Sequence, residues 1–482
     1  MKHLKAPFIS LVVVLMLVTV ASADSPDPGS GSVNFTVMNM DASASATVRA
    51  DYINQSGSVE KYVEQTLDPR SSAGFAIGDS ALPDNWIGSV IASSDKEIVA
   101  FAQARWEGGA NGDGKTAGAY NGFTEGASKL YFPSLAARDG KQFSRLSIQS
   151  AEAASSSETI DITIEFYDRD GNLSQTVNDT VLKGSQKTYS LLDDVNLTAD
   201  WKGSAVVEGG GPIAGVSTMH WKEYTGAYSG VTGGGLEAYL PSITRRLPSG
   251  PWYQYTAVLV QNLNTTTAAS VTTYWYDRDG NEVHSFTDSI PPNSSHGYNT
   301  RWTNSDVPNH NAFHNGLGDD FNGSVKITSN VDIVAIANLQ WTTDSPVGLA
   351  ATAYSSEPGG YSEVAVPATF RREDSGTWKQ FSGLIVQNVG SAACNNFDVE
   401  WRDRSGTLLL SYQDSLNPNI SHGYNSRYGG QVPSGADVAD LGTDFRGSVF
   451  ISASGCELIA IHNTLWNVWT DSTTYNAFGK NP

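Results

Sequence analysis

Four copies of one residue pattern run through this 482-residue chain. Each copy carries an aromatic residue, one variable residue and then Gly-Ser, and the four glycines lie 115, 120 and 124 residues apart. A tryptophan follows each glycine after 18 or 19 residues. Such a repeat has to be recognised before any motif is interpreted, because missing it leads to the wrong fold. The glycines are Gly88, Gly203, Gly323 and Gly447, and the tryptophans are Trp106, Trp221, Trp341 and Trp466.

Within each copy, apolar residues recur at every second position. Ile98–Trp106 and Ile333–Trp341 both show this alternation. A period of two indicates a β-strand with one buried face. Seven short strands can be counted in the third copy, so we expect an all-β fold, a tandem array of four immunoglobulin-like antiparallel β-sandwich domains.

The repeat also sets the expected domain borders. Linkers between the copies are short, so we expect neighbouring domains to pack end to end into a rod, as in other repeat arrays. The predicted segments are a signal peptide at 1–23 and β-sandwich repeats at 24–129, 130–238, 239–363 and 364–482.

The first 23 residues have the order of a secretory signal peptide. Lys2 and Lys5 precede the apolar run Phe8–Val20, and Ala21-Ser22-Ala23 supplies the small residues of a cleavage site. We expect cleavage after Ala23 and an extracellular or cell-surface location. No later stretch has the ~18 consecutive apolar residues of a membrane span. The formal net charge of −20 disfavours nucleic acid as a partner, because an acidic surface repels phosphates.

The chain has two cysteines, Cys394 and Cys456. If every strand reverses direction, the loops that carry them lie at the same end of one sandwich. Because export makes a disulfide feasible, we predict a Cys394–Cys456 bond, with two separate buried thiols as the alternative.

Two further motifs have simple structural explanations. Gly109–Thr116 fits a phosphate-binding loop, but the residues after it cannot form the helix that such a loop needs, so we expect a glycine-rich connection between strands. His310 and His314 have the spacing of a zinc pair on a helix, yet they lie in a polar insertion. The equivalent segment of the fourth copy, Gln431–Asp444, has no histidine, so an ordinary polar loop is expected.

A calcium site is the alternative interpretation of two acidic turns. Asp168 and Asp170, and likewise Asp277 and Asp279, resemble the opening of a calcium-binding loop, but no bidentate acid follows at the required spacing. Hairpin turns favour the same Asp and Gly chemistry, so we expect turns and keep weak calcium binding as the alternative cofactor prediction.

Most tryptophans fall in register across the copies and are therefore expected in cores or contacts between copies. A histidine, a tyrosine and an arginine recur together in the third and fourth copies and are candidates for ligand contacts. We find no nucleophile elbow and no triad, so we expect a non-enzyme. The candidate ligand-binding residues are Trp302, Tyr298, His296, Arg301, His422, Tyr424 and Arg427.

Several repeated strings resemble uncharacterised exported bacterial proteins built of repeated immunoglobulin-like β-sandwich domains. The strings are Ala119-Tyr-Asn-Gly122, Tyr239-Leu-Pro241, Val260-Gln-Asn262, Val386-Gln-Asn388 and Gly-Ser-Val. The resemblance covers nearly the whole chain after residue 23. It implies an extracellular or cell-surface repeat protein and brings no catalytic residue with it.

We therefore expect a non-catalytic structural repeat protein. The first copy lacks the proline-led opening strand of the other three, and the exposed sheet edge could take a strand from another molecule, which predicts head-to-tail self-association. The alternative function is binding of a surface polysaccharide, or adhesion, through the aromatic and histidine residues of the third and fourth copies.

Overall fold

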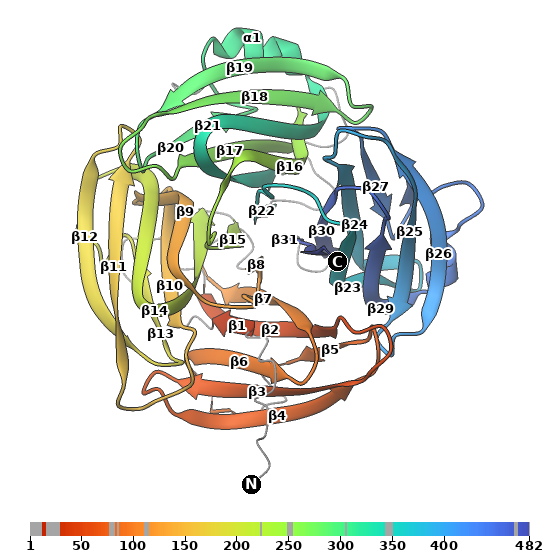
Figure 1. The fold of residues 1–482 in the computed structure, drawn as a ribbon, viewed down its shortest axis with the longest axis horizontal. Coiled ribbons are helices and arrows are strands. Elements are labelled where there is room, and N and C mark those ends of the chain that lie inside the picture. Colours follow the sequence, from red (N-terminus) through yellow and green to blue (C-terminus); the bar gives the residue numbers. More distant parts are fainter. Residues whose placement is uncertain are drawn as a thin grey trace.

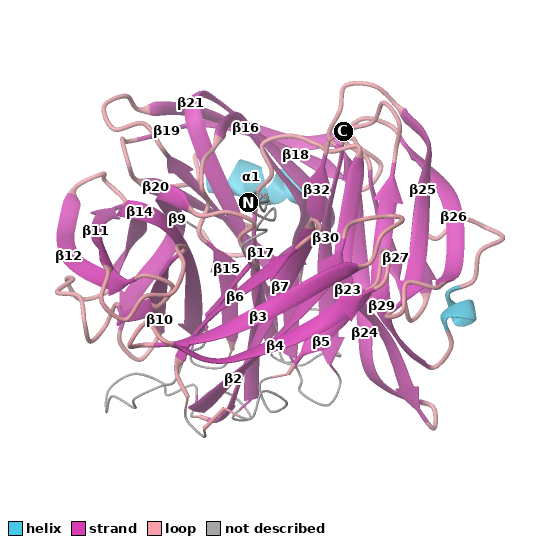
Figure 2. Cartoon of the chain, turned by 60° about the horizontal axis from the view of Figure 1, so that its bottom comes forward, coloured by secondary structure: helices cyan, strands magenta, loops and turns pink. Residues whose placement is uncertain are grey.

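The computed structural model describes residues 12–15, 29–76, 82–83, 86–109, 115–221, 224–247, 254–303, 306–342, 350–466 and 471–481. Antiparallel strands are the main structural element of this part of the chain, and helices are short and few (Figure 2). The predicted all-β fold is confirmed. We call the four successive sets of strands units 1 to 4, spanning 29–121, 127–229, 235–355 and 363–480. Whether each unit folds as a separate domain stays a prediction.

Each unit contains the same strand order. Unit 1 holds β2 (Gly29–Asn39), β3 (Ala46–Asn54), β4 (Val59–Leu67), β5 (Ser72–Phe75), β6 (Gly88–Ser94), β7 (Ile98–Gly108) and β8 (Lys115–Asn121). Unit 2 holds β9 (Ala127–Arg138), β10 (Gln142–Ser150), β11 (Thr159–Asp168), β12 (Leu173–Leu182), β13 (Gln186–Ser190), β14 (Trp201–Trp221) and β15 (Thr225–Ser229).

Units 3 and 4 repeat that order with short helical insertions. Unit 3 holds β16 (Gly235–Arg246), β17 (Gln254–Asn262), β18 (Ala269–Asp277), β19 (Glu282–Ile290), β20 (Ser295–Asn299), α1 (His310–Leu317), β21 (Asp320–Trp341) and β22 (Ala350–Ser355). Unit 4 holds β23 (Glu363–Asp374), β24 (Thr377–Asn388), β25 (Cys394–Asp403), β26 (Leu408–Leu416), β27 (Ser421–Asn425), β28 (Gly429–Gly430), the 3₁₀ helix Val438–Leu441, β29 (Asp444–Ser452), β30 (Leu458–Trp466), β31 (Asp471–Asn476) and β32 (Phe478–Lys480).

The glycines of the four Gly-Ser strands, which we call the anchor glycines, lie where a side chain has no room. A side chain on Gly203 would lie 1.9 Å from the carbonyl oxygen of Tyr167, a residue of the neighbouring strand β11, and 2.6 Å from the ring of Trp201. The other three anchor glycines meet a carbonyl oxygen at 1.8 to 2.2 Å and the preceding aromatic ring at 2.4 to 2.9 Å. Only glycine leaves room for this approach, in which the aromatic side chain covers the strand.

A tyrosine recurs near the end of each unit, and we call these residues the closing tyrosines: Tyr120, Tyr228, Tyr354 and Tyr475. In units 2 to 4 this tyrosine links the end of the unit to its first strand. The hydroxyl of Tyr228 donates to the carbonyl oxygen of Ser134 at 2.9 Å and accepts the amide of the same residue at 3.2 Å. Tyr354 and Ser242 make the same two bonds, as do Tyr475 and Ala368. Units 2 to 4 thus use the residue after the opening proline as a backbone anchor.

The four units close into a ring, so the predicted rod is wrong. Figure 1 shows them around one axis, with β8, β15, β22 and β31 nearest to it, and these innermost strands contact one another. Unit 4 packs directly against unit 1, because the rings of Phe101 and Tyr475 stack at 4.2 Å between centroids. Arg70 and Glu400 form an ion pair of 3.0 Å across the same joint. Contacts of this kind cannot form between the two ends of a straight array.

The sheet edge predicted to be open in unit 1 is covered in the structure. A four-residue strand, β1 (Val12–Leu15), pairs antiparallel with β6. It lies within the segment predicted to be a signal peptide, and the rest of that segment lies outside the described residues. None of the helices in the described ranges is long and apolar enough to cross a lipid bilayer.

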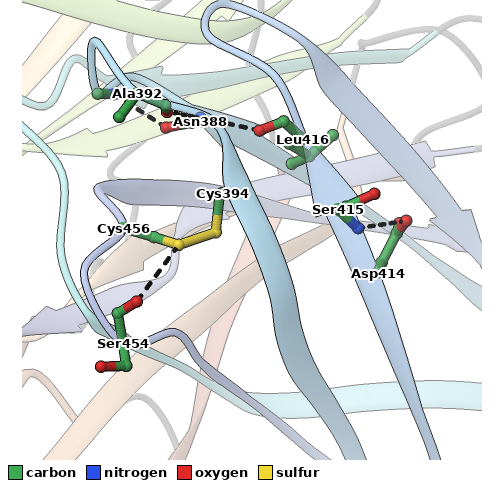
Figure 3. Close-up of a disulfide and its surroundings, with 9 residues drawn as sticks. Asn388, Ala392, Cys394, Asp414, Ser415, Leu416, Ser454 and Cys456 are labelled. Atoms are coloured by element: carbon green, nitrogen blue, oxygen red, sulfur yellow. Dashed lines mark hydrogen bonds between the residues drawn. A yellow bond between two sulfur atoms is a disulfide. The ribbon is translucent and has the colours of Figure 1, made fainter.

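The predicted disulfide is present between Cys394, at the start of β25, and Cys456, in the turn before β30 (Figure 3). The insertion that contains His310 and His314 differs from the expected polar loop, because it forms helix α1. Asn309 caps the helix, and Phe313 and Leu317, four residues apart, are buried on its inner face. This apolar spacing was a helical signal that the high content of polar residues obscured.

Candidate functional site

The two acidic turns considered for calcium, at Asp168–Asp170 and Asp277–Asp279, are closed by hydrogen bonds within each turn. In the turn after β11, the Asp168 carboxylate accepts the amides of Asp170 and Asn172 at 3.0 and 2.8 Å. Asp277 does the same in the turn after β18. Among the described residues, no three His, Cys, Asp or Glu side chains gather where they could hold a metal ion.

An arginine in the middle of these turns enters the next unit. Arg169 Nη1 donates to the carbonyl and hydroxyl oxygens of Ser295, at 2.5 and 2.6 Å. Arg278 Nη1 donates to the Ser421 hydroxyl at 2.9 Å, and burial lowers the pKa of Arg278 to about 10. The turns that resembled calcium loops are therefore joints of the ring.

Four of the predicted ligand-binding residues form two matching buried groups. Tyr298 and Tyr424 are fully buried, and their hydroxyls donate to Asp288 and Asp414 at 3.0 and 2.6 Å. A histidine lies on the same acid in each unit, with 2.6 Å between the ring nitrogen and the carboxylate oxygen: His296 on Asp288, and His422 on Asp414.

The acid is the centre of each group. Burial would raise the pKa of the Asp288 carboxyl, but the hydrogen bonds from His296 and Tyr298 outweigh burial and lower that pKa. The pKa of Asp414 is lowered in the same way by His422 and Tyr424. Neither tyrosine ring is accessible to a sugar, whereas the side chains of His296 and His422 remain 15% and 24% exposed.

Two aromatic side chains beside these groups are exposed. Trp302 is 57% exposed, and Tyr428, at the same position in unit 4, is 66% exposed. Each lies next to an arginine: Arg301 is 4.4 Å from the ring centroid of Trp302, and Arg427 is 4.5 Å from that of Tyr428. Sequence reasoning identified Trp302 and both arginines but missed Tyr428, although it follows Arg427 directly, as Trp302 follows Arg301.

Each of these two arginines lies near a second aromatic ring as well. Arg301 also lies 4.7 Å from the ring of Tyr255, and Arg427 lies 5.3 Å from the ring of Trp378. Each arginine is thus within cation–π distance of two aromatic rings, one of them exposed. Units 3 and 4 therefore each present an exposed aromatic ring beside an arginine, and we call these two rings, Trp302 and Tyr428, the platforms.

Trp302 borders a cleft of about 610 Å³ between units 2 and 3. The cleft combines aromatic side chains, amides and charged groups of both signs. Its lining includes Trp221, Arg138, Lys202, Asn338 and Gln340. Burial lowers the pKa of the Lys202 ammonium. Aromatic faces combined with amide donors and acceptors can recognise a polar ligand that has an apolar face.

A second cavity, of about 880 Å³, opens on the axis of the ring. Residues that follow the closing tyrosines form its base and are joined by hydrogen bonds. Asn121 Nδ2 donates to the Asn476 carbonyl at 2.7 Å, Asn476 Nδ2 donates to the Ser355 carbonyl at 2.7 Å, and the Ser229 hydroxyl donates to the Asn121 carbonyl at 2.6 Å. These bonds link all four units around the axis.

Glu357 is an acid on the wall of this axial cavity. Its carboxylate accepts from Tyr361 Oη at 2.9 Å and from Asn476 Nδ2 at 2.8 Å. Burial raises the pKa of Glu357 to about 7. The hydrogen bonds from Tyr361 and Asn476 hold the Glu357 carboxyl between units 3 and 4, so this group contributes to the stability of the ring.

The predicted phosphate loop lies mostly outside the described residues. Its last two residues, Lys115 and Thr116, begin strand β8 rather than a helix. A helix N-terminus that could hold phosphate is therefore not formed at the lysine.

Compared with known proteins, the chain matches no family model and no curated protein. Among solved structures, Thermotoga maritima 1070 is 19% identical, and the match covers 22% of this chain and 94% of that chain with a TM-score of 0.19. A tetra-tandem repeat from the extending region of a large adhesion protein is 11% identical over 98% of this chain and 100% of that chain, with a TM-score of 0.10. The BSP domain of a biofilm associated protein is 9% identical over 99% and 98%, with a TM-score of 0.14. TM-scores this low carry no argument about fold or function.

Proposed function

We propose that the protein is a non-catalytic structural protein of the extracellular space or the cell surface. The observation that carries this proposal is where the repeated residues lie. The anchor glycines, the closing tyrosines and the arginines of the joints all serve packing within units or contacts between them. Residues kept in register for a shared reaction would instead gather at accessible sites. The leader-like residues 1–23 support export.

Localisation and particle shape test this proposal together. Cells that produce the protein should carry it on the outside, accessible to a membrane-impermeant label, and the purified protein should appear as rings by negative stain. Light scattering across micromolar concentrations should show a single ring of constant mass, whereas a mass that grows with concentration would support the head-to-tail self-association expected from the sequence. Retention of the whole protein in the cytoplasm with residues 1–23 attached would contradict the proposal.

A second candidate function is binding of a surface polysaccharide. It is favoured by the two exposed platforms, Trp302 and Tyr428, which occupy the same position in units 3 and 4 and rest on arginines. Pyranose rings present apolar faces that stack on aromatic side chains, and the amides in the cleft beside Trp302 could bond to their hydroxyls.

A glycan array tests this second candidate. Trp302→Ala and Tyr428→Ala should each weaken binding to the same glycan, and the double variant should abolish it. Tyr62→Ala is the matched control, because Tyr62 is also exposed and also lies beside an arginine, Arg49, but sits on the outer strand β4 of unit 1. Equal binding by the wild type and the double variant would exclude the platforms as the binding site.

A further inference from the structure

Unit 1 lacks a strand that the other units supply themselves. In units 2, 3 and 4 the opening strand, β9, β16 or β23, pairs along the edge of the Gly-Ser strand. In unit 1 the same edge belongs to β6, and β1 takes the place of the opening strand. Units 2, 3 and 4 thus complete this sheet with a strand of their own, whereas in unit 1 the strand comes from the leader-like residues 1–23.

The register of β1 matches that of the opening strands. Val14 lies opposite Val90, just as Phe132 lies opposite Ala205 in unit 2. In units 3 and 4 the equivalent opening-strand residues are Leu240 and Val366. Phe132, Leu240 and Val366 are all fully buried, so this register position belongs to the core in the other three units.

The two edges of this sheet of unit 1 differ in composition. β4, at one edge, carries Glu60, Lys61 and Glu64, the kind of charged residues that prevent edge-to-edge pairing. β6, at the other, reads Gly-Ser-Val-Ile-Ala-Ser-Ser, with no charge and no proline. Because β6 has none of these protections, its sequence suits a strand that is covered by a partner.

Removal of residues 1–23 would take β1 away from the edge of β6. The residues that follow are poorly suited to pair there in its place. The next residues, Asp24-Ser-Pro-Asp-Pro28, include two acids and two prolines, which have no amide hydrogen to donate. Gly29 already begins β2, which pairs with β7. The strands in the described part of the chain are paired within the ring, so none of those strands in a second copy is spare to fill this edge.

We propose that export turns the edge of β6 into an acceptor site for a β-strand from a different protein. The donor segment is extended, carries branched aliphatic residues at the positions of Val12 and Val14, and has no charge in the paired stretch. Backbone hydrogen bonds to β6 supply the affinity, and the core positions supply the specificity. The inference rests on the export part of the proposed function and is independent of glycan binding.

A register-specific cross-link tests this assignment. The exported protein is purified with Ile91→Cys, and its N-terminus is determined by mass spectrometry. The probe is a synthetic peptide of residues 10–17 with flanking lysines and Val13→Cys, because Val13 pairs with Ile91. Directly opposed strand residues lie within the range of a disulfide. We expect at least a tenfold higher cross-linked fraction than with a Val12→Cys peptide or with Val63→Cys on β4.

A direct binding measurement tests the same acceptor site without any cysteine substitution. A labelled peptide without cysteine should bind the unmodified exported protein with 1:1 saturation, and a Val13→Pro peptide should not. Equal cross-linking at all positions, or no binding, would overturn the proposal. So would a mature chain that still contains Val12–Leu15, or a disulfide-linked dimer of Ile91→Cys protein formed without peptide. Trp302→Ala leaves the peptide result unchanged, so the two proposals fail separately.

Discussion

The joint between units 1 and 4 is the part of the fold that a rod would not have, and Phe101→Ala tests it. Phe101 lies on β7 of unit 1, is 2% exposed, and belongs to the hydrophobic cluster of unit 4. Truncating a buried phenylalanine costs about 3–5 kcal/mol in lost burial and cavity formation. In a rod the side chain would face solvent, where substitutions stay within about 0.5 kcal/mol.

Urea denaturation and hydrogen exchange measure the two consequences of this substitution. The free energy of unfolding should fall by about 3–5 kcal/mol, and amides of β31, whose Tyr475 stacks on Phe101, should exchange faster. Phe166→Ala is the matched control, because Phe166 is fully buried in the core of unit 2. The control should lose similar stability without selective exchange in β31. A loss below about 1 kcal/mol for Phe101→Ala, or identical exchange in both variants, would refute the closed joint.

Three further predictions follow from other contacts. Replacing Cys394 and Cys456 by alanine removes a cross-link that spans 62 residues, and should lower the free energy of unfolding by about 4 kcal/mol in urea; an unchanged midpoint would contradict this. Glu357 holds a proton in the folded state that the unfolded chain releases, since burial raises its pKa from 4.5 to about 7, so stability should fall as pH rises through this range. Glu357→Gln should flatten that pH dependence in thermal unfolding, and an identical slope would count against it. Arg278→Gln removes the arginine that joins unit 3 to unit 4 and introduces glutamine, the residue that unit 1 has at the matching position, Gln55. The free energy of unfolding measured by denaturation should fall by about 1–3 kcal/mol. Wild-type stability would show that the bond to Ser421 is dispensable.

The strands and the fold class were predictable because they depend on short-range patterns, and the disulfide was predictable because the chain has two cysteines. Alternation along Ile98–Trp106 identifies the face of β7 that lies in the core of unit 1. The other face, with Val99 and Phe101, is buried as well, because unit 4 packs on it in the closed ring. Ring closure depends instead on the rotation between neighbouring units. That rotation is set by contacts between residues far apart in the chain, such as Arg70 with Glu400, which no local pattern reveals.

The candidate site was predicted less well, since recurrence does not separate exposed from buried residues. Tyr298 and Trp302 lie four residues apart, yet the first is fully buried and the second is 57% exposed. The buried Tyr298 has a partner that spacing does not reveal, because its hydroxyl donates to Asp288, ten residues away along the chain. Comparison of units 3 and 4 residue by residue would have found Tyr428, which occupies the position of Trp302 with a chemically similar side chain.

Small-angle X-ray scattering of the purified protein tests the closed ring most directly. A compact chain of this length has a radius of gyration of roughly 23 Å, and the ring predicts a value near it. Four units of this size joined end to end would give roughly 40 Å and a long tail in the distance distribution. The lower value, unchanged over a range of protein concentrations, is the result we expect, and the higher one would contradict the ring.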